Sequence, residues 1–207
     1  MEVPARKLVI ACGALAHEIA ALRRANGWSA LDVVCLPPEL HNRPEKIAAA
    51  VRAKIHEHRG AYAGIFVAYA DCGTRGELDA VLAEEGVERI AGAHCYEFFA
   101  GPGAFAALAE AEPGSFYLTD FLLRHFDRLV IQALGIDRHP ELQAQYFGNY
   151  RRLVYLAQAP APDSEAAARR VAERLGLELM VRPTGYGGLG AALQSFAGRP
   201  AVRVWPA

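Results

Sequence analysis

Four cysteines are the residues of this sequence best suited to chemistry. Cys12, Cys35, Cys72 and Cys95 all come at or just after the end of an apolar run that predicts a strand. The carboxyl ends of parallel strands meet at one edge of a sheet, where ligands bind, so cysteines far apart in sequence can converge there. Because thiolates bind zinc and iron–sulfur clusters tightly, this pattern predicts a metal site at that edge.

Local context separates three of the cysteines from the fourth. Cys12 and Cys72 each precede a glycine, which lets the backbone approach a ligand closely, and Cys95 follows His94. Cys35 has no adjacent glycine and is expected in the core. We therefore predict Cys12, Cys72 and Cys95 as metal ligands. Three thiolates leave a fourth position open, which is typical of a catalytic rather than a structural site.

The polar residues beside these cysteines are the candidate catalytic groups. His94, Asp71 and Glu97 lie within two residues of a predicted ligand, so each is suited to serve as a fourth ligand or a proton-transfer group. The pattern leaves zinc and an iron–sulfur cluster open. Core packing stays the alternative, because free cysteine behaves as a small hydrophobe and the chain has no Cys-x-x-Cys pair.

A helix start after the second predicted strand supplies a candidate anion-binding residue. Arg43 precedes Pro44, which favours the first turn of a helix, and the unpaired backbone N–H groups there can bind an anionic substrate group. The alternative is that Asn42 simply caps this helix.

Two further segments are candidates for cofactor binding. Tyr150 and Arg151 lie in an aromatic and arginine-rich stretch suited to stacking on a planar ligand and pairing with its carboxylate or phosphate, although an ordinary turn is the alternative. Gly185 and Gly187 belong to a formal G-x-G-x-x-G sequence. The second strand and acidic residue of a dinucleotide site do not follow it, so we expect a glycine loop closing over the ligand edge.

Short apolar runs alternate with helical patterns along the chain. Strands are expected at 7–12, 31–36, 62–69, 87–90, 116–118, 152–158, 177–181 and 202–205. Helices are expected at 14–24, 44–58, 74–85, 104–112, 119–134, 141–147 and 165–175. This alternation predicts a three-layer α/β fold that is Rossmann-like, with one mainly parallel sheet of about five to seven strands and helices on both faces.

Composition limits the organisation and the partners of the chain. Its 207 residues, 53% of them hydrophobic, predict a single α/β domain over 1–207, with a C-terminal sub-lobe at 160–207. The formal charge of -1 argues against a nucleic-acid partner. No apolar run reaches the roughly 20 residues of a membrane span and no signal peptide is evident, so we expect a cytoplasmic protein without a membrane partner.

Several motifs resemble an uncharacterised prokaryotic family of domains of unknown function, number sixteen thirty-eight. They are the sequences at 11–14, 40–45, 69–74, 94–101, 116–120 with 124–127, and 146–150, and the resemblance spans about residues 7 to 190. Members of that family are often encoded near corrinoid-dependent methyltransferase systems. The resemblance therefore implies a methyl-transfer or one-carbon context, with a corrinoid-methyltransferase system as a partner.

Together these observations predict a cytoplasmic metalloprotein, with an enzyme acting on a small-molecule substrate as the leading hypothesis. Its zinc or iron–sulfur site would be held by three cysteines at strand ends. The alternative is a non-catalytic accessory protein that binds a small molecule or a cofactor.

Overall fold

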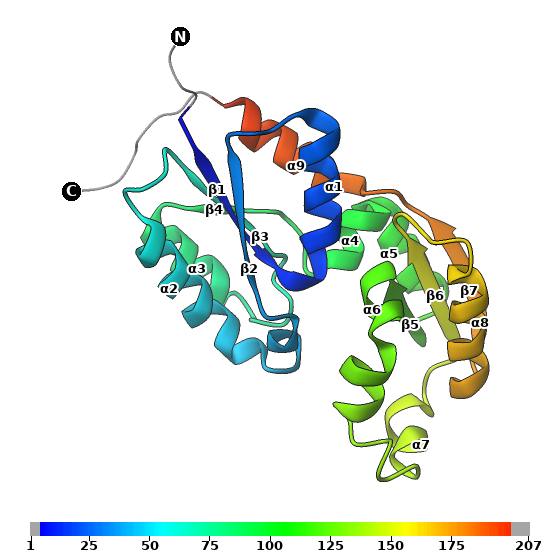
Figure 1. Ribbon diagram of the computed structural model, residues 1–207. Coiled ribbons are helices and arrows are strands. Elements are labelled where there is room, and N and C mark those ends of the chain that lie inside the picture. Colours follow the sequence, from blue (N-terminus) through cyan, green and yellow to red (C-terminus); the bar gives the residue numbers. More distant parts are fainter. Residues whose placement is uncertain (1–4, 200–207) are drawn as a thin grey trace. The chain divides into compact units, whose positions relative to one another are not determined.

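The computed structural model describes residues 5–199, which form two compact units (Figure 1). Unit 1 contains residues 5–95 and 188–199, and unit 2 contains residues 96–187. Each unit is α/β with a parallel sheet, which confirms the predicted fold class. The strands divide into a sheet of four and a sheet of three, whereas the sequence had predicted one sheet.

The sheet of unit 1 contains the strand that ends at the first cysteine. Its strands are β1 (Lys7–Cys12), β2 (Leu31–Leu36), β3 (Ile65–Ala68) and β4 (Glu88–Arg89). They pair in the order β2-β1-β3-β4, all parallel. The chain moves outward from β1 to β2 and then returns past β1 to β3. The strand order therefore reverses between β1 and β3, and such a switch point opens a crevice at the carboxyl ends of the strands.

Helices cover both faces of this sheet. They are α1 (Ala16–Asn26), α2 (Ile47–His58), α3 (Glu77–Glu85) and α9 (Gly187–Gly198). In Figure 1, α1 and α9 lie on one side of the sheet and α2 and α3 on the other. Ile47, Val51 and Ile55 form a fully buried stripe at a spacing of four, so α2 presents its apolar face to the sheet. This arrangement confirms the three layers in unit 1.

Unit 2 has a smaller parallel sheet. It contains β5 (Ser115–Thr119), β6 (Arg152–Ala157) and β7 (Glu178–Pro183), in the order β5-β6-β7. Its helices are α4 (Cys95–Ala100), which starts at the last residue of unit 1, α5 (Pro102–Ala111), α6 (Asp120–Arg124), α7 (Leu142–Phe147) and α8 (Ser164–Leu175). Its core is centred on the fully buried side chains of Leu118, Leu153 and Tyr155.

The single helix expected at 119–134 is wrong. Helix α6 ends at Arg124, and Asp127–Gln132 is a π-helix. Phe121, Phe126 and Ile131 are all buried at a spacing of five residues. An i→i+5 turn places such residues on one face, whereas an α-helix would rotate them apart. The wider turn keeps Phe126 and Ile131 on the buried side of the segment.

Helix α8 and strand β7 belong to unit 2, while α9 belongs to unit 1 apart from its first residue, so the two units share the segment predicted as a C-terminal sub-lobe. The strand expected at 202–205 lies outside the described residues. None of the helices within 5–199 has the length and apolarity needed to cross a membrane.

Candidate functional site

The end of β1 brings Cys12 next to a histidine from the loop after β2. Cys12 is 3% exposed and its Sγ accepts a hydrogen bond from the Ala14 backbone N–H. The same Sγ lies 3.6 Å from Nδ1 of His41. A Cβ added at Gly13 would come within 2.9 Å of the Leu36 carbonyl oxygen, so only glycine lets the two strand ends approach this closely.

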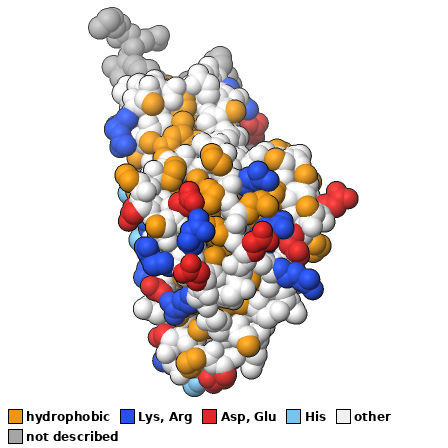
Figure 2. Space-filling model, turned by 90° about the vertical axis from the view of Figure 1, so that its right-hand side faces the viewer, with side chains coloured by type: hydrophobic (Ala, Val, Ile, Leu, Met, Phe, Trp, Pro, Cys, Tyr) orange, Lys and Arg blue, Asp and Glu red, His pale blue; other side chains and the backbone are white. Residues whose placement is uncertain are grey.

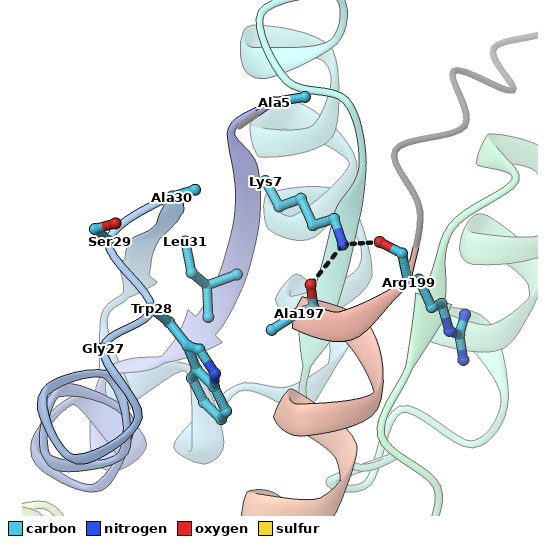
Figure 3. A pocket seen from close by; sticks show the side chains of 9 residues that line it. All are labelled: Ala5, Lys7, Gly27, Trp28, Ser29, Ala30, Leu31, Ala197 and Arg199. Carbon is cyan, nitrogen blue, oxygen red and sulfur yellow. Dashed lines mark hydrogen bonds between the residues drawn. The ribbon is translucent and has the colours of Figure 1, made fainter. Parts of the chain in front are cut away.

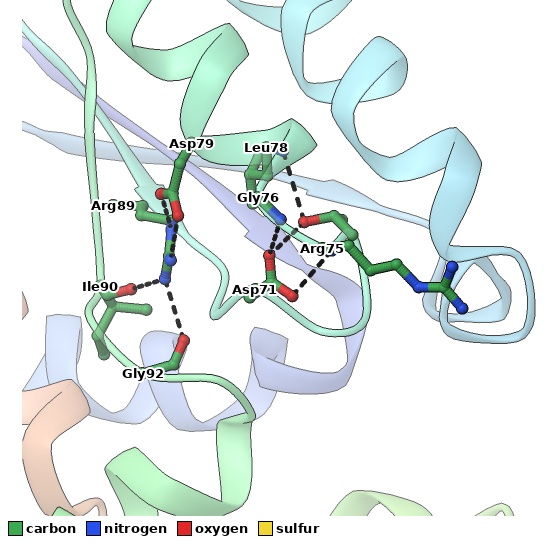
Figure 4. A network of polar contacts seen from close by, with 9 residues as sticks. Asp71, Arg75, Gly76, Leu78, Asp79, Arg89, Ile90 and Gly92 are labelled. Carbon is green, nitrogen blue, oxygen red and sulfur yellow. Dashed lines mark hydrogen bonds and ion pairs between the residues drawn. The ribbon is translucent and has the colours of Figure 1, made fainter.

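Cys72 follows β3 in the chain. Asp71 organises the loop that contains it (Figure 4). The Asp71 carboxylate accepts hydrogen bonds from Thr74 Oγ1 at 2.6 Å, Gly76 N at 3.0 Å and Arg75 N at 3.1 Å. Within this loop Cys72 adopts a left-handed backbone conformation with φ 51°. That conformation is unusual for a residue other than glycine, and it is held in place by the surrounding bonds.

A second network in Figure 4 supports the neighbouring chain. Arg89 pairs through two nitrogens with both carboxylate oxygens of Asp79, at 2.6 and 2.8 Å, and also donates to the carbonyls of Ile90 and Gly92. The backbone N–H of Cys72 donates to the Ala93 carbonyl at 2.8 Å. The segment leading to Cys95 is therefore bound alongside the Cys72 loop.

Tyr69 lies between these groups. Its side chain is 1% exposed, and its ring stacks on that of His41 with centroids 6.4 Å apart. Within residues 5–199 its buried hydroxyl has no hydrogen-bond partner at ordinary distance and angle, and the weakly polar thiol of Cys12 lies beside it. Burial raises the pKa of Tyr69, and the neighbouring Cys12 raises it further. A buried hydroxyl without a partner is costly, so a ligand that supplies one would be stabilised here.

Burial keeps both thiols protonated at neutral pH. It raises the pKa of Cys12 to about 12 and that of Cys72 to about 11, although backbone hydrogen bonds partly oppose both shifts. His41 is an exposed residue. Desolvation by the protein atoms near its ring nevertheless lowers the pKa of His41, and nearby His94 lowers it further. The edge thus presents two neutral thiols and a neutral imidazole, not a pre-formed thiolate nucleophile.

The predicted ligands occupy different positions. Cys72 is close enough to Cys12 to contribute to the raised pKa of Cys12. Cys95 starts α4, is partly buried, and is linked to Cys72 through its backbone. Within the described residues, no three His, Cys, Asp or Glu side chains are grouped so that they could hold a metal ion. The metal site stays a prediction.

The expectation of Cys35 in the core is wrong. Its side chain is exposed. Strand β2 is at the edge of the sheet and pairs with a neighbouring strand, β1, along one side only. Its residues from Asp32 to Cys35 are therefore not fully buried. Cys35 nevertheless contributes to the pKa shifts of Cys12 and Tyr69, which places it near the site.

The predicted catalytic and anion-binding groups are spread over both units. Asp71 is engaged in its loop, His94 is exposed in unit 1, and Glu97 is partly buried in the part of α4 that belongs to unit 2. Arg43 is exposed directly before a 3₁₀ turn at Pro44–Lys46. Asn42 ends the preceding turn and does not cap, so the capping alternative is wrong.

The predicted cofactor-binding pair Tyr150 and Arg151 lies in unit 2. The Tyr150 ring contacts Phe116 and Phe147, with centroids 5.8 Å apart in each case. Arg151 donates its backbone N–H to Gly114 and accepts from Glu178 N. These contacts place the pair at the amino ends of β5, β6 and β7, opposite the carboxyl edge where ligands of parallel sheets usually bind.

The glycine-rich sequence has a packing role. A Cβ at Gly187 would come within 2.4 Å of the carbonyl oxygens of Phe98 and Phe99, whereas a Cβ at Gly185 would meet nothing within 4 Å. Both glycines have positive φ, at 47° and 57°. The loop therefore turns the chain from β7 into α9 and lets it pass close to α4.

A separate pocket of about 370 Å³ opens at the amino end of β1 (Figure 3). Its one buried charged side chain among the described residues is Lys7. The Lys7 ammonium donates to the carbonyls of Phe196, Ala197 and Arg199 at the end of α9. Lys7 therefore joins β1 to α9 and is not available to a ligand.

Sequence reasoning missed two members of the site. His41 was named only within the polar segment at 40–45, and Tyr69 only as the end of a strand and the first residue of the motif at 69–74. The available signal was their position in the chain, because His41 comes shortly after β2 and Tyr69 directly after β3.

The comparisons with known proteins identify a family only. No curated protein and no solved structure matches this chain. The matched family region starts at residue 35, so β1 and Cys12 precede it. With residues 35–193 matched, the chain belongs to the family described as "Protein of unknown function (DUF1638)".

Proposed function

We propose that the carboxyl edge of the unit 1 sheet binds a zinc ion, with Cys12 and His41 as the first two ligands. The main observation in support of this proposal is the 3.6 Å separation between Cys12 Sγ and His41 Nδ1. Tetrahedral zinc with a Zn–S bond of about 2.3 Å and a Zn–N bond of about 2.0–2.1 Å sets its sulfur and nitrogen ligands about 3.5 Å apart. The pair thus has the spacing of two ligands that share one metal.

Cys72 is the proposed third ligand. No described group of three ligands is assembled, so binding requires Cys72 to move toward the Cys12–His41 pair. In the loop that holds Cys72, two residues other than glycine, Cys72 and Arg75, have left-handed backbones, and this strain favours a rearrangement that a metal bond would stabilise. Cys95, whose backbone contacts Cys72, is the alternative third ligand.

Zinc would displace the thiol protons and leave one position open. Metal binding to protonated thiols releases protons, so affinity for zinc is expected to rise with pH. A substrate thiol or water bound at the open position would be activated by the metal, and the Tyr69 hydroxyl is available to hydrogen-bond to it. Activation of a thiol or water fits the methyl-transfer context that the family resemblance implies, with a corrinoid-methyltransferase system as the proposed partner.

The test is metal analysis of protein purified without oxygen, followed by zinc titration against a chromogenic chelator. We expect about one equivalent of zinc, lost in Cys12→Ser and His41→Ala and weakened at least about tenfold in Cys72→Ser. Cys35→Ser is the matched control, because it removes an exposed thiol near the site that is not a proposed ligand.

Three results would contradict the proposal. Absence of zinc, together with failure of the protein to compete with the chelator for zinc, would show that there is no metal site. Equal loss of zinc in Cys35→Ser would show that the proposed ligands are not the specific ones. Acid-labile sulfide and a brown colour would show that the site holds an iron–sulfur cluster and not zinc.

A further inference from the structure

Unit 2 contains a pocket of about 470 Å³ between α6 with the following π-helix and α8. Four arginines line it: Arg124, Arg128, Arg170 and Arg174. Asp127 is the one carboxylate among the lining residues. The lining therefore holds four guanidinium groups against one carboxylate.

Two of these guanidinium groups have no carboxylate partner within the described residues. Arg174 donates to Asp127 at 2.7 Å, which neutralises one positive charge. No ion pair within 5–199 involves Arg124 or Arg170. Arg170 and Arg174 are one turn apart on α8 and both line the pocket, so Arg170 adds a positive charge beside the Arg174–Asp127 pair. An anion in the pocket would pair with Arg124 and Arg170.

The floor of the pocket is apolar. Leu123, Phe126, Ala167 and Val171 line it, and Phe126 is 4% exposed within the core of unit 2. Its volume lies within the roughly 300–1,000 Å³ of small-molecule sites, which combine apolar walls with a few polar groups. The pocket therefore suits a ligand that has an apolar body as well as negative charge.

The π-helix shapes this lining. Asp127, Arg128 and Gln132 come from Asp127–Gln132, and the wider turn sets both their positions and the burial of Phe126. π-Helical turns within helical segments are rare and frequently occur at functional sites. The presence of a π-helix in the pocket wall is therefore a second reason to regard this pocket as a ligand-binding site.

Charge is mixed on the face of the molecule that Figure 2 shows. On the face shown in Figure 2, basic side chains (blue) alternate with acidic ones (red), with apolar ones between them. The described side chains on that face thus form no broad field of one sign. Selection of an anion requires a local cluster, and the arginine pocket provides one.

We propose that this pocket binds a small organic anion that carries at least two negative charges, as phosphate or carboxylate groups, on an apolar body. Guanidinium groups form paired hydrogen bonds with both phosphate and carboxylate groups, and the apolar side chains of the pocket would contact the remainder of the ligand. The site lies in unit 2 and uses none of the residues proposed to bind zinc.

The test uses 1-naphthyl phosphate as the probe, with 1-naphthol and inorganic phosphate as its separate halves, in calorimetric titrations at low salt. We expect the probe to bind at least about tenfold more tightly than either half, and added salt to weaken it. Arg124→Ala and Arg170→Ala should each weaken it by about threefold to tenfold. Both arginines are exposed, and circular dichroism checks that the variants fold.

Arg169→Ala is the matched control. Arg169 neighbours Arg170 on α8 but pairs with Glu165 at 3.1 Å and does not line the pocket. It should leave the affinity within about twofold, since truncation of an exposed pair changes little. Equal weakening by Arg169→Ala would show nonspecific attraction, and absence of probe binding would overturn the site. Cys12→Ser should bind the probe normally, which separates this result from the zinc proposal.

Discussion

Solvent access distinguishes the cysteines at the scale of single residues. Cys12 is buried and Cys72 is partly buried, and their pKa values are raised to about 12 and about 11. Cys35 is exposed, and partial desolvation raises the pKa of its thiol as well. Only the thiolate reacts with alkylating agents, so a raised pKa slows all three thiols and poor access slows Cys12 further. A metal would change this balance by displacing the protons, which makes thiol reactivity a direct reporter of the metal-free state.

Alkylation of the metal-free protein with iodoacetamide at about pH 7.5 should therefore modify Cys35 well before Cys12. Mass spectrometry of peptides over time measures the two rates. The Cys12 rate should rise about tenfold per pH unit up to pH 9, because the thiolate fraction does so below the pKa. In urea the two cysteines should react alike, and Cys12 labelling as fast as Cys35 in the folded protein would contradict the burial.

Asp71 should make the stability of unit 1 depend on pH. Burial disfavours its charged form, but hydrogen bonds from Thr74, Gly76 and Arg75 outweigh burial and lower its pKa. A carboxylate with a lowered folded-state pKa contributes stability that is present above its unfolded value of about 3.9 and lost as pH falls through the folded value.

Asp71→Asn should thus lower the free energy of unfolding by about 1–2 kcal/mol at pH 7 and by much less near pH 3. Urea unfolding at both pH values measures the difference. Asp137→Asn is the control, since within residues 5–199 the exposed Asp137 makes only a long contact of 3.8 Å with Arg138. A cost that does not change with pH would show that the charge of Asp71 is unimportant.

At the scale of elements, close packing decides where the glycine-rich loop tolerates a side chain. Gly185 and Gly187 both have left-handed backbones, but only Gly187 lies against the carbonyls of α4. The two positions therefore separate backbone strain from steric overlap. The G-x-G-x-x-G pattern alone does not distinguish them.

Gly187→Ala should cost about 2–4 kcal/mol of stability, and Gly185→Ala about 1 kcal/mol. The first substitution adds a Cβ within 2.4 Å of two backbone oxygens, while the second meets open space. Thermal and urea unfolding compare the two variants. An equal loss of stability in the two variants would mean that the backbone at Gly187 does not lie tightly against α4.

Local patterns predicted most elements but not their exceptions. Apolar runs located the strands that contain or precede Cys12 and Cys72, and strand-end logic brought these two cysteines to one edge. Helical periodicity could not reveal the π-helix, because Phe121, Phe126 and Ile131 show their spacing of five only once the core is known. Cys35 was misplaced because sequence does not show which strand lies at an edge.

At the scale of the whole molecule, the chain has two units whose sheets are independent. Strand pairing depends on contacts far apart in sequence, so the sequence could not divide one predicted sheet into two. Whether the units unfold together as one domain stays a prediction. Lys7 offers a way to test it, because its contacts at the end of α9 join the two chain segments of unit 1.

Lys7→Met should remove amide-exchange protection from β1 and α9 while β6 and β7 keep theirs. The ammonium of Lys7 is buried and hydrogen-bonded to backbone carbonyls, so its loss leaves those acceptors unpaired. Hydrogen exchange followed by mass spectrometry measures each peptide, and exposed Lys46→Met serves as the control. Equal loss of protection in both units would show a single cooperative domain.

Unit 1 is built from two stretches of chain that are separated by the whole of unit 2, and this affects how the protein folds during synthesis. The ribosome releases residues 96–187 before α9, which supplies Phe196 to stack on Phe66 in β3 and the carbonyls that bind Lys7. Unit 2 can fold as it emerges, since domains generally fold as units during translation. The first sheet must wait for α9 with part of its apolar face uncovered, so the nascent chain is expected to need chaperone protection over that interval.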